Sequence, residues 1–235
     1  MEEFLTAHFW VAVGQIIMID ILLGGDNAVV IALACRSLPP HQRTKGIIWG
    51  TAGAIILRVI LIAFALALLA IPFLKVVGAL LLVWIGVKLI APHEEDGHAN
   101  IQSSDKLWSA VKTVIVADLV MSIDNVIAIA GAAQGAGEKH QMALVIFGLL
   151  VSIPIIVWGS QLVLKLMDRF PIIITVGGML LGWIAGTMAH TDPAVVNYLP
   201  QGKLWHYGLG VVGALLVLAI GKFLQSRQPV ASGDG

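Results

Sequence analysis

The sequence is poor in charged residues and in cysteine. Of its 235 residues only 12% are charged, against about 25% in an average soluble protein, while 58% are hydrophobic. So little polar surface excludes a soluble globule of this size and indicates a protein with several membrane-spanning segments. The single cysteine, Cys35, excludes an internal disulfide and a cysteine-rich metal site. The formal net charge is zero, so the charge balance gives no support to a nucleic-acid partner.

The N-terminus lacks the basic residues of a cleavable signal peptide, since it begins Met1-Glu2-Glu3. The first apolar run is also long enough to cross a bilayer. We therefore expect that run to be the first helix of the mature protein.

Long apolar runs account for most of the chain. A bilayer core of about 30 Å requires roughly 20 apolar residues of a helix, and seven runs approach that length. The predicted spans lie close to residues 9–34, 46–71, 73–91, 109–133, 142–165, 171–189 and 204–224. The sequence therefore predicts an all-α polytopic membrane protein, with seven transmembrane helices in a single membrane domain.

The segments between the runs are short and polar. The longest, residues 92–107, is too small to form a domain, and we expect it to be a cytoplasmic linker between two halves. Residues 225–235 are mostly small or polar and are expected to form a disordered tail. His190 and Asp192 follow the sixth run, where we expect interfacial polar residues.

Lys and Arg residues are distributed unevenly between the two sides. Short loops rich in these residues remain in the cytoplasm. With the N-terminus outside and the C-terminus cytoplasmic, most of them fall on the inner side: Arg36, Arg43, Lys45, Lys88, Lys106, Lys112, Lys165, Arg169, Lys222 and Arg227. The residues that fall on the outer side are Lys75, Lys139 and Lys203.

One polar motif occurs twice. Asp20, Asp26 and Asn27 recur with the same spacing as Asp118, Asp124 and Asn125. Each copy lies in the first span of a three-helix unit, the first unit at about 8–91 and the second at about 108–190. Because three spans are an odd number, the two units must enter the bilayer from opposite sides, as inverted repeats. The run 204–224 is then a seventh helix outside the repeats.

The chemistry of the motif indicates a cation site. Each aspartate in a span costs about 2.5–3.5 kcal/mol on insertion scales, and a bound cation is the simplest compensation. Oxygen ligands suit magnesium, calcium or manganese(II), whereas zinc and copper usually recruit His or Cys. In transporters with inverted repeats, the substrate site lies near mid-membrane between the repeats. The predicted ligands are Asp20, Asp26, Asn27, Asp118, Asp124 and Asn125.

Two glycines separate the first pair of aspartates. In an unbroken helix Asp20 and Asp26 would point about 120° apart and could not readily share a ligand. Gly24 and Gly25 are the residues most apt to break that helix, so that both carboxylates turn inward.

Two further polar residues lie near the predicted site. Ser122 occupies a position equivalent to one of the glycines, and its hydroxyl can bond to the backbone carbonyl of Asp118 or serve as a ligand. Arg58 lies within the second span, and its counterpart in the second repeat is Ile156. A buried arginine needs a carboxylate partner, so Arg58 either forms a structural ion pair with one of the aspartates or acts as a gate that yields it to the cation.

The glycines of the sixth run have a packing role. Gly178, Gly182 and Gly186 recur at four-residue spacing and let that helix approach a neighbour closely.

Gly24-Gly25-Asp26-Asn27 and Ser122-Ile123-Asp124-Asn125, each with an acidic residue six positions before the aspartate, resemble the motifs of the TerC family of bacterial integral membrane proteins. The resemblance is closest to the short YjbE-like members and covers residues 8 to about 224. It implies a multi-pass protein of the bacterial cytoplasmic (inner) membrane that exports manganese(II). It also implies metal contact by the six predicted ligands. Gly24 departs from the family, which commonly has serine there.

The first hypothesis is therefore an exporter of a divalent cation, with no enzymatic activity and no permanently bound cofactor. Mn2+ is the expected substrate, alternating access comes from one repeat moving against the other, and protons are a plausible counter-ion. The sequence leaves open the cation, the direction of flux, the driving ion and the oligomeric state, a homo-oligomer included.

Two alternatives belong to other classes. An intramembrane aspartyl protease also needs two aspartates in the membrane, but Leu23 occupies the first glycine position of the expected Gly-x-Gly-Asp pattern. An exporter of small organic solutes would need aromatic or cationic pocket residues, for which Arg58 is the one candidate.

Overall fold

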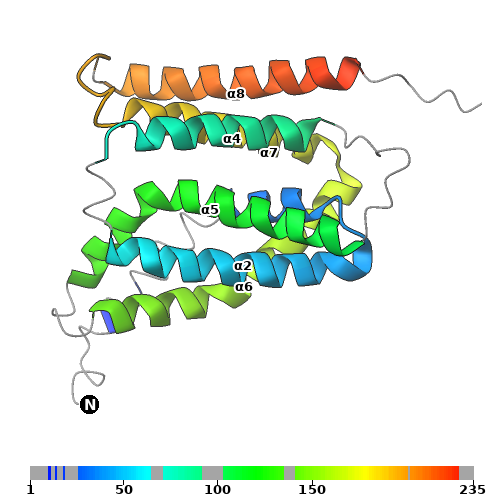
Figure 1. The fold of residues 1–235 in the computed structure, drawn as a ribbon, viewed down its shortest axis with the longest axis horizontal. Helices are drawn as coiled ribbons and strands as arrows, with labels where there is room; N and C mark the ends of the chain where they lie inside the picture. The colour runs from blue at the N-terminus through cyan, green and yellow to red at the C-terminus, as the bar shows by residue number, and fades with distance from the viewer. Residues whose placement is uncertain are drawn as a thin grey trace, which may run out of the picture.

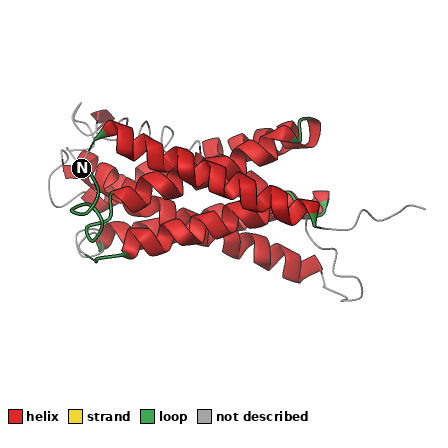
Figure 2. Cartoon of the chain, turned by 90° about the horizontal axis from the view of Figure 1, so that it is seen from above, coloured by secondary structure: helices red, strands yellow, loops and turns green. Residues whose placement is uncertain are grey.

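The computed structural model describes residues 26–64, 71–91, 103–134, 141–200 and 202–227, together with Trp10, Val11, Gly14 and Met18. Side chains are described for these residues except 63, 103 and 124–145. Every regular element in the described ranges is a helix, and none of them is a strand (Figure 2). The expected all-α class is confirmed.

The helices fall on the seven predicted runs. The shorter helix Asp26–Cys35 lies in the first run. The labelled helices are α2 (Pro40–Ala63), α4 (Leu74–Ile90), α5 (Ser103–Gln134), α6 (Gln141–Arg169), α7 (Ile172–His190) and α8 (Lys203–Ser226). Among the described residues, four helices are long and apolar enough to cross a membrane by length and composition: α2, α6, α7 and α8.

Two helices begin earlier than their apolar runs. α2 begins at Pro40, where proline suits the first turn because the missing N–H would have no partner there. α5 begins at Ser103, inside the segment expected to be a linker, and its first turn is polar. Hydropathy locates the apolar part of a helix, and the polar turns that extend it carry no such signal.

The labelled helices form two groups of three (Figure 1). In one group α7 packs against both α4 and α8, and in the other α2 packs against α5 and α6. The helix Asp26–Cys35 links the groups, because Ala28 lies against Gly159 of α6 while Leu33 lies against Gly177 of α7.

The contacts fix the relative directions of the helices. Gly50 of α2 lies against Val114 of α5, and Arg58 further along α2 meets Asp118 further along α5, so these two helices are parallel. Close approach at Gly50 is required, since an added Cβ would come within 2.9 Å of the Val114 side chain.

In the other group, α7 runs opposite to its two neighbours. Ile90 at the end of α4 lies against Gly178 near the start of α7 and against Gly221 near the end of α8. Gly78 near the start of α4 lies against Met188 near the end of α7.

One end of the bundle collects the basic residues. Arg43 Nη1 pairs with Asp168 Oδ2 at 2.7 Å, which joins the start of α2 to the end of α6. Phe170 and Pro171 alone separate α6 from α7. The starts of α2, α5 and α7 and the ends of α4, α6 and α8 therefore share one end. This end carries Arg43, Lys45, Lys88, Lys106, Lys112, Lys165, Arg169, Lys222 and Arg227.

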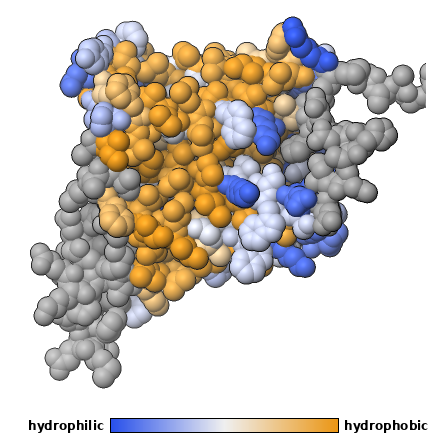
Figure 3. All heavy atoms as spheres, in the orientation of Figure 1, coloured by the Kyte–Doolittle hydropathy of each residue, from blue (hydrophilic) through white to orange (hydrophobic). Residues whose placement is uncertain are grey.

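The outer surface is largely apolar. Figure 3 shows a face that is mostly hydrophobic, with hydrophilic residues gathered toward its ends. Trp49, Trp108, Trp158 and Trp205 are all exposed, and Trp108 and Trp205 lie near the starts of α5 and α8, as expected of side chains that anchor a helix at the lipid interface. A surface of this kind suits contact with a bilayer.

Candidate functional site

Two polar residues of α5 form the base of the site. Asp118 and Ser122 lie one helical turn apart and therefore on the same face. Both are buried, with exposed fractions of 7% and 0%. The Ser122 hydroxyl donates to Asp118 Oδ2 at 3.0 Å. The hydroxyl thus bonds to the carboxylate of Asp118 and not to its backbone carbonyl, and the role of Ser122 as a ligand stays a prediction.

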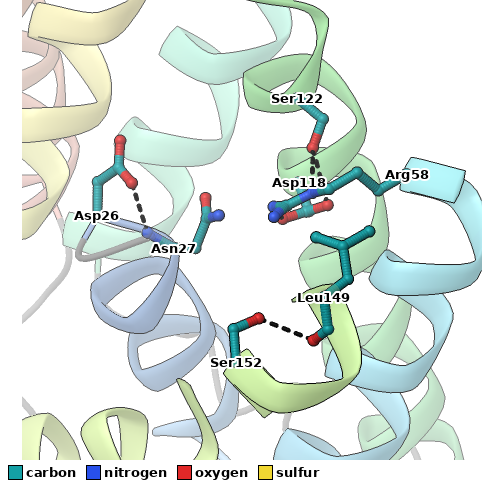
Figure 4. A network of polar contacts seen from close by, with 7 residues as sticks. All are labelled: Asp26, Asn27, Arg58, Asp118, Ser122, Leu149 and Ser152. Atoms are coloured by element: carbon teal, nitrogen blue, oxygen red, sulfur yellow. Dashed lines mark hydrogen bonds and ion pairs between the residues drawn. The ribbon is translucent and has the colours of Figure 1, made fainter. Parts of the chain in front are cut away.

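Arg58 completes this cluster from α2 (Figure 4). Its Nη2 pairs with Asp118 Oδ1 at 2.5 Å, and its Nε donates to Ser122 Oγ at 3.0 Å. Arg58 is only 2% exposed. The expected ion pair with an aspartate is confirmed, and its partner is Asp118. Whether the pair also acts as a gate stays a prediction.

Asp26 and Asn27 face this cluster from the other side. The Asn27 side chain points toward Asp118 and Arg58 in Figure 4 and is 3% exposed. Within the part of the chain that the structure describes, neither its Nδ2 nor its Oδ1 has a hydrogen-bond partner. A buried polar group left unpaired costs about 1–3 kcal/mol, so this amide is suited to a ligand. Asp26 Oδ1 accepts the backbone N–H of Asn27 at 2.8 Å.

Asp26 is also close enough to interact electrostatically with both Arg58 and Asp118. The first and second copies of the motif therefore contribute to one charged region.

The site lies well inside the bundle. Gly46 is near the basic end of α2 and lies against Cys35. At 1.5 Å per residue, Arg58 is about 18 Å further along α2, and Asn27 is about 12 Å from Cys35. Both depths are close to half of a bilayer core of about 30 Å.

Some predicted residues cannot be placed in this way. Asp20, Gly24 and Gly25 lie outside the described residues, and Asp124 and Asn125 lie in α5 with side chains outside the description. Among the side chains that are described, no group of three or more His, Cys, Asp or Glu residues could hold a metal. The described members of the predicted site are thus Asp26, Asn27, Arg58, Asp118 and Ser122.

Two buried hydroxyls, one of them near the site, were not predicted. Ser152 of α6 is 0% exposed, and its Oγ donates to the Leu149 carbonyl at 2.8 Å on the side of the cluster drawn below Asn27 in Figure 4. Thr51 of α2 is 2% exposed, and its Oγ1 has no partner among the described residues. A single hydroxyl residue in an apolar run does not by itself indicate a functional site. Ser152 lies one helical turn from Ile156, the counterpart of Arg58, and this position could have indicated that it lies near the site.

Asp192 has a structural role at the opposite end from the basic residues. Its carboxylate accepts four backbone N–H groups, from Phe73 and Lys75 at 3.0 Å, Val76 at 3.2 Å and Ala194 at 2.7 Å. Burial raises the pKa of Asp192, but the four hydrogen bonds together outweigh it, so the pKa lies below its usual value.

Comparisons with known proteins agree with one another. The sequence profile described as "Integral membrane protein TerC family" matches residues 5–229. Membrane protein YjbE of Bacillus subtilis (strain 168) is 43% identical over 186 residues, which cover 79% of this chain and 82% of that protein. Membrane protein YceF of the same strain is 30% identical over 188 residues, covering 77% and 71%. Inner membrane protein YgdQ of Escherichia coli (strain K12) is 23% identical over 180 residues, covering 69% and 73%. No solved structure matches the chain significantly.

Proposed function

This chain belongs to the TerC family of integral membrane proteins, and from that premise we propose that it exports a hard divalent cation, manganese(II), from the cytoplasm. The observation that carries the proposal is the buried polar cluster of Asp118, Arg58, Ser122 and Asn27, halfway along an otherwise apolar bundle. Ionisable residues at that depth are costly, and function is the default explanation for them.

The donor set of the cluster fits a cation of this kind. Asp118 offers a carboxylate, Ser122 a hydroxyl and Asn27 an amide oxygen, which are all hard oxygen ligands. The unpaired Asn27 amide supports the proposal most directly, because a bound cation would satisfy its oxygen. Asp20, Asp26, Asp124 and Asn125 complete the proposed ligand set.

We propose that all seven helices span the membrane as two inverted repeats and a seventh helix. α4, the shortest labelled helix, has 17 residues and is about 26 Å long, close to the thickness of the core. α2 runs parallel to α5. In the same way, the first run is parallel to α6, because the Trp10 ring lies 6.4 Å from Phe147 and Ala28 lies against Gly159. Such an exchange of contacts is expected of two related halves.

The third helices support the same symmetry. Gly78 of α4 lies against Val120 in the first helix of the second unit. Its counterpart Gly177 of α7 lies against Val29 and Leu33 in the first helix of the first unit. Each third helix thus packs on the motif-bearing helix of the other unit.

The proposed orientation places the basic end of the bundle in the cytoplasm and the N-terminus outside. The proposed location is the bacterial cytoplasmic membrane, in keeping with the name of the inner membrane protein YgdQ. Protons are the proposed counter-ion, carried by the acidic residues of the site other than Asp118, which pairs with Arg58.

Binding of manganese to the purified protein tests the proposal. Calorimetric titration with Mn2+, Ca2+ and Mg2+ is expected to show saturable binding of Mn2+, weakened at least about tenfold by Asp26→Ala, Asn27→Ala and Asp124→Ala. Asp168→Asn is the matched control, because Asp168 pairs with Arg43 on the surface and is remote from the cluster. Binding that survives all three site substitutions would contradict the proposal.

Transport is the second half of the test. Cells that lack the protein are expected to accumulate manganese and to grow poorly in its presence. The wild-type gene should restore both properties, and the Asp26→Asn and Asp124→Asn variants should not. Unchanged manganese content in cells without the protein would exclude export of this ion.

A further inference from the structure

Arg58 already occupies the carboxylate that the substrate would need. Its guanidinium pairs with Asp118 Oδ1 and bonds to Ser122 Oγ, and Ser122 in turn bonds to the other oxygen of Asp118. All three side chains are more than nine-tenths buried. Asp118 is therefore neutralised within the chain itself in this arrangement.

A divalent cation that binds Asp118 would compete with the guanidinium of Arg58 for this carboxylate. They carry charge of the same sign, and in a low-dielectric interior their repulsion is strong. If the cation binds Asp118, this repulsion favours movement of Arg58 away from the carboxylate. The arginine side chain is long and flexible, so its guanidinium can shift several Å without a change in the backbone of α2.

The opposite half of the cycle poses a complementary problem. A carrier that has released its cation must return across the membrane, and an unpaired carboxylate at half depth would make that step costly. Arg58 removes the cost at Asp118. The second repeat has no arginine at the position that matches Arg58, because the buried Ile156 of α6 occupies it.

We propose that Arg58 is a tethered counter-cation: it neutralises Asp118 while the carrier is empty, is displaced by the incoming substrate cation, and thereby permits the empty carrier to return. This inference rests on the proposed function. It assigns Arg58 to one step of the cycle, the return of the empty carrier, and leaves the step with bound cation independent of it.

Two transport assays in proteoliposomes separate those steps. Net manganese efflux into a manganese-free medium requires return of the carrier without manganese, whereas exchange of manganese for manganese uses the loaded carrier alone. Arg58→Gln is expected to retain exchange while net efflux falls about 100-fold, the effect of leaving one charge unpaired at mid-membrane. Arg58→Lys keeps the charge, so its ratio of net efflux to exchange should remain within a few fold of that of the wild type.

The double variant Arg58→Gln, Asp118→Asn gives the sharpest test. It removes both members of the ion pair, so the net charge of the empty site returns to that of the wild type. Manganese binding is weaker, yet the ratio of net efflux to exchange should return to that of the wild type. A ratio that stays as low as in Arg58→Gln would overturn the inference.

The other possible results also support or contradict the proposed role of Arg58. Equal loss of net efflux and exchange in Arg58→Gln, or no loss of either, would show that Arg58 is not specific to the empty carrier. If Arg58→Gln does not yield folded protein, Arg58→Lys and the double variant decide by the same ratio. Wild-type protein that performs neither assay with manganese would instead refute the proposed function.

Discussion

At the scale of single residues, the carboxylate of Asp192 caps a helix from a distant part of the chain. It accepts the backbone N–H groups of Phe73, Lys75 and Val76 in the first turn of α4. These groups have no partner within the helix, and the helix dipole favours a negative charge beside them. Phe73 adopts a left-handed conformation, with φ of 63°, that few non-glycine residues tolerate, and Asp192 holds it there.

Removal of this cap should destabilise the protein. Asp192→Ala is expected to lower the free energy of unfolding by about 1–2 kcal/mol, because the amides of α4 lose their acceptor. Thermal unfolding in detergent measures the change. Asp168→Asn is the control, since an exposed ion pair contributes less than about 1 kcal/mol. Equal stability of Asp192→Ala and the wild type would exclude a capping role.

The same cap predicts how stability depends on pH. Because the pKa of Asp192 is lowered in the folded protein, its contribution is complete above the unfolded value of about 3.9 and is lost as the pH falls through the folded value. The stability difference between wild type and Asp192→Asn should therefore be constant from about pH 7 to pH 5 and shrink below about pH 4. Unfolding curves recorded over this range test it, and a difference that grows in acid would contradict it.

A sequence pattern shows that a residue needs a contact more readily than it shows which residue provides that contact. The sequence indicated that Arg58 requires a carboxylate, but the choice of Asp118 depends on the parallel packing of α2 on α5, which no local spacing shows. Asp192 was expected only to be an interfacial polar residue. Its role as a cap could not be read from the sequence, because its donors lie in its own loop and at the start of the distant helix α4.

At the scale of elements, the contact between α7 and α8 depends on glycine. Gly182 and Gly186 of α7 lie directly against the backbone of α8 at Gly213 and Leu209, and Gly178 lies against Gly86 of α4. The close approach expected from the glycine spacing is confirmed. The spacing did not reveal that two different helices share the glycines.

This contact predicts the effect of added methyl groups. Gly213→Ala should destabilise the protein by about 1–3 kcal/mol, because the new Cβ would meet the backbone of Gly182 and neither helix can move aside cheaply. Gly208→Ala on the same helix meets nothing within 4 Å, so it should leave stability unchanged or raise it by up to about 1 kcal/mol. Thermal unfolding in detergent compares the two. Similar effects of both substitutions would show that the contact is loose.

At the scale of the whole molecule, the helix directions place the basic residues at one end. This arrangement agrees with the distribution of Lys and Arg that the sequence showed, because both follow from the alternation of apolar runs. The grouping of α4 with α7 and α8, and of α2 with α5 and α6, was not predicted, since it depends on which small residues meet.

Labelling of introduced cysteines tests the orientation. In a Cys35→Ser background, a membrane-impermeant maleimide added to whole cells should label Gly202→Cys, which precedes α8 at the end that we propose to face outside. Arg227→Cys, beyond the other end of α8, should be labelled only after the cells are made permeable. The reverse pattern would place the basic end outside and refute the proposed orientation.

The attachment of Asp192 to α4 has a mechanical consequence. Glycine contacts join α7 to α4 and α8 along their length, and Asp192 ties the α7–α8 connection to the start of α4. These three helices are therefore packed closely together, and the polar cluster lies on α2, on α5 and at the start of the helix Asp26–Cys35. Separation of α4 from that loop would leave the backbone amides of Phe73, Lys75 and Val76 without this carboxylate, so we expect the start of α4 to stay attached to the α7–α8 connection during any movement of the bundle.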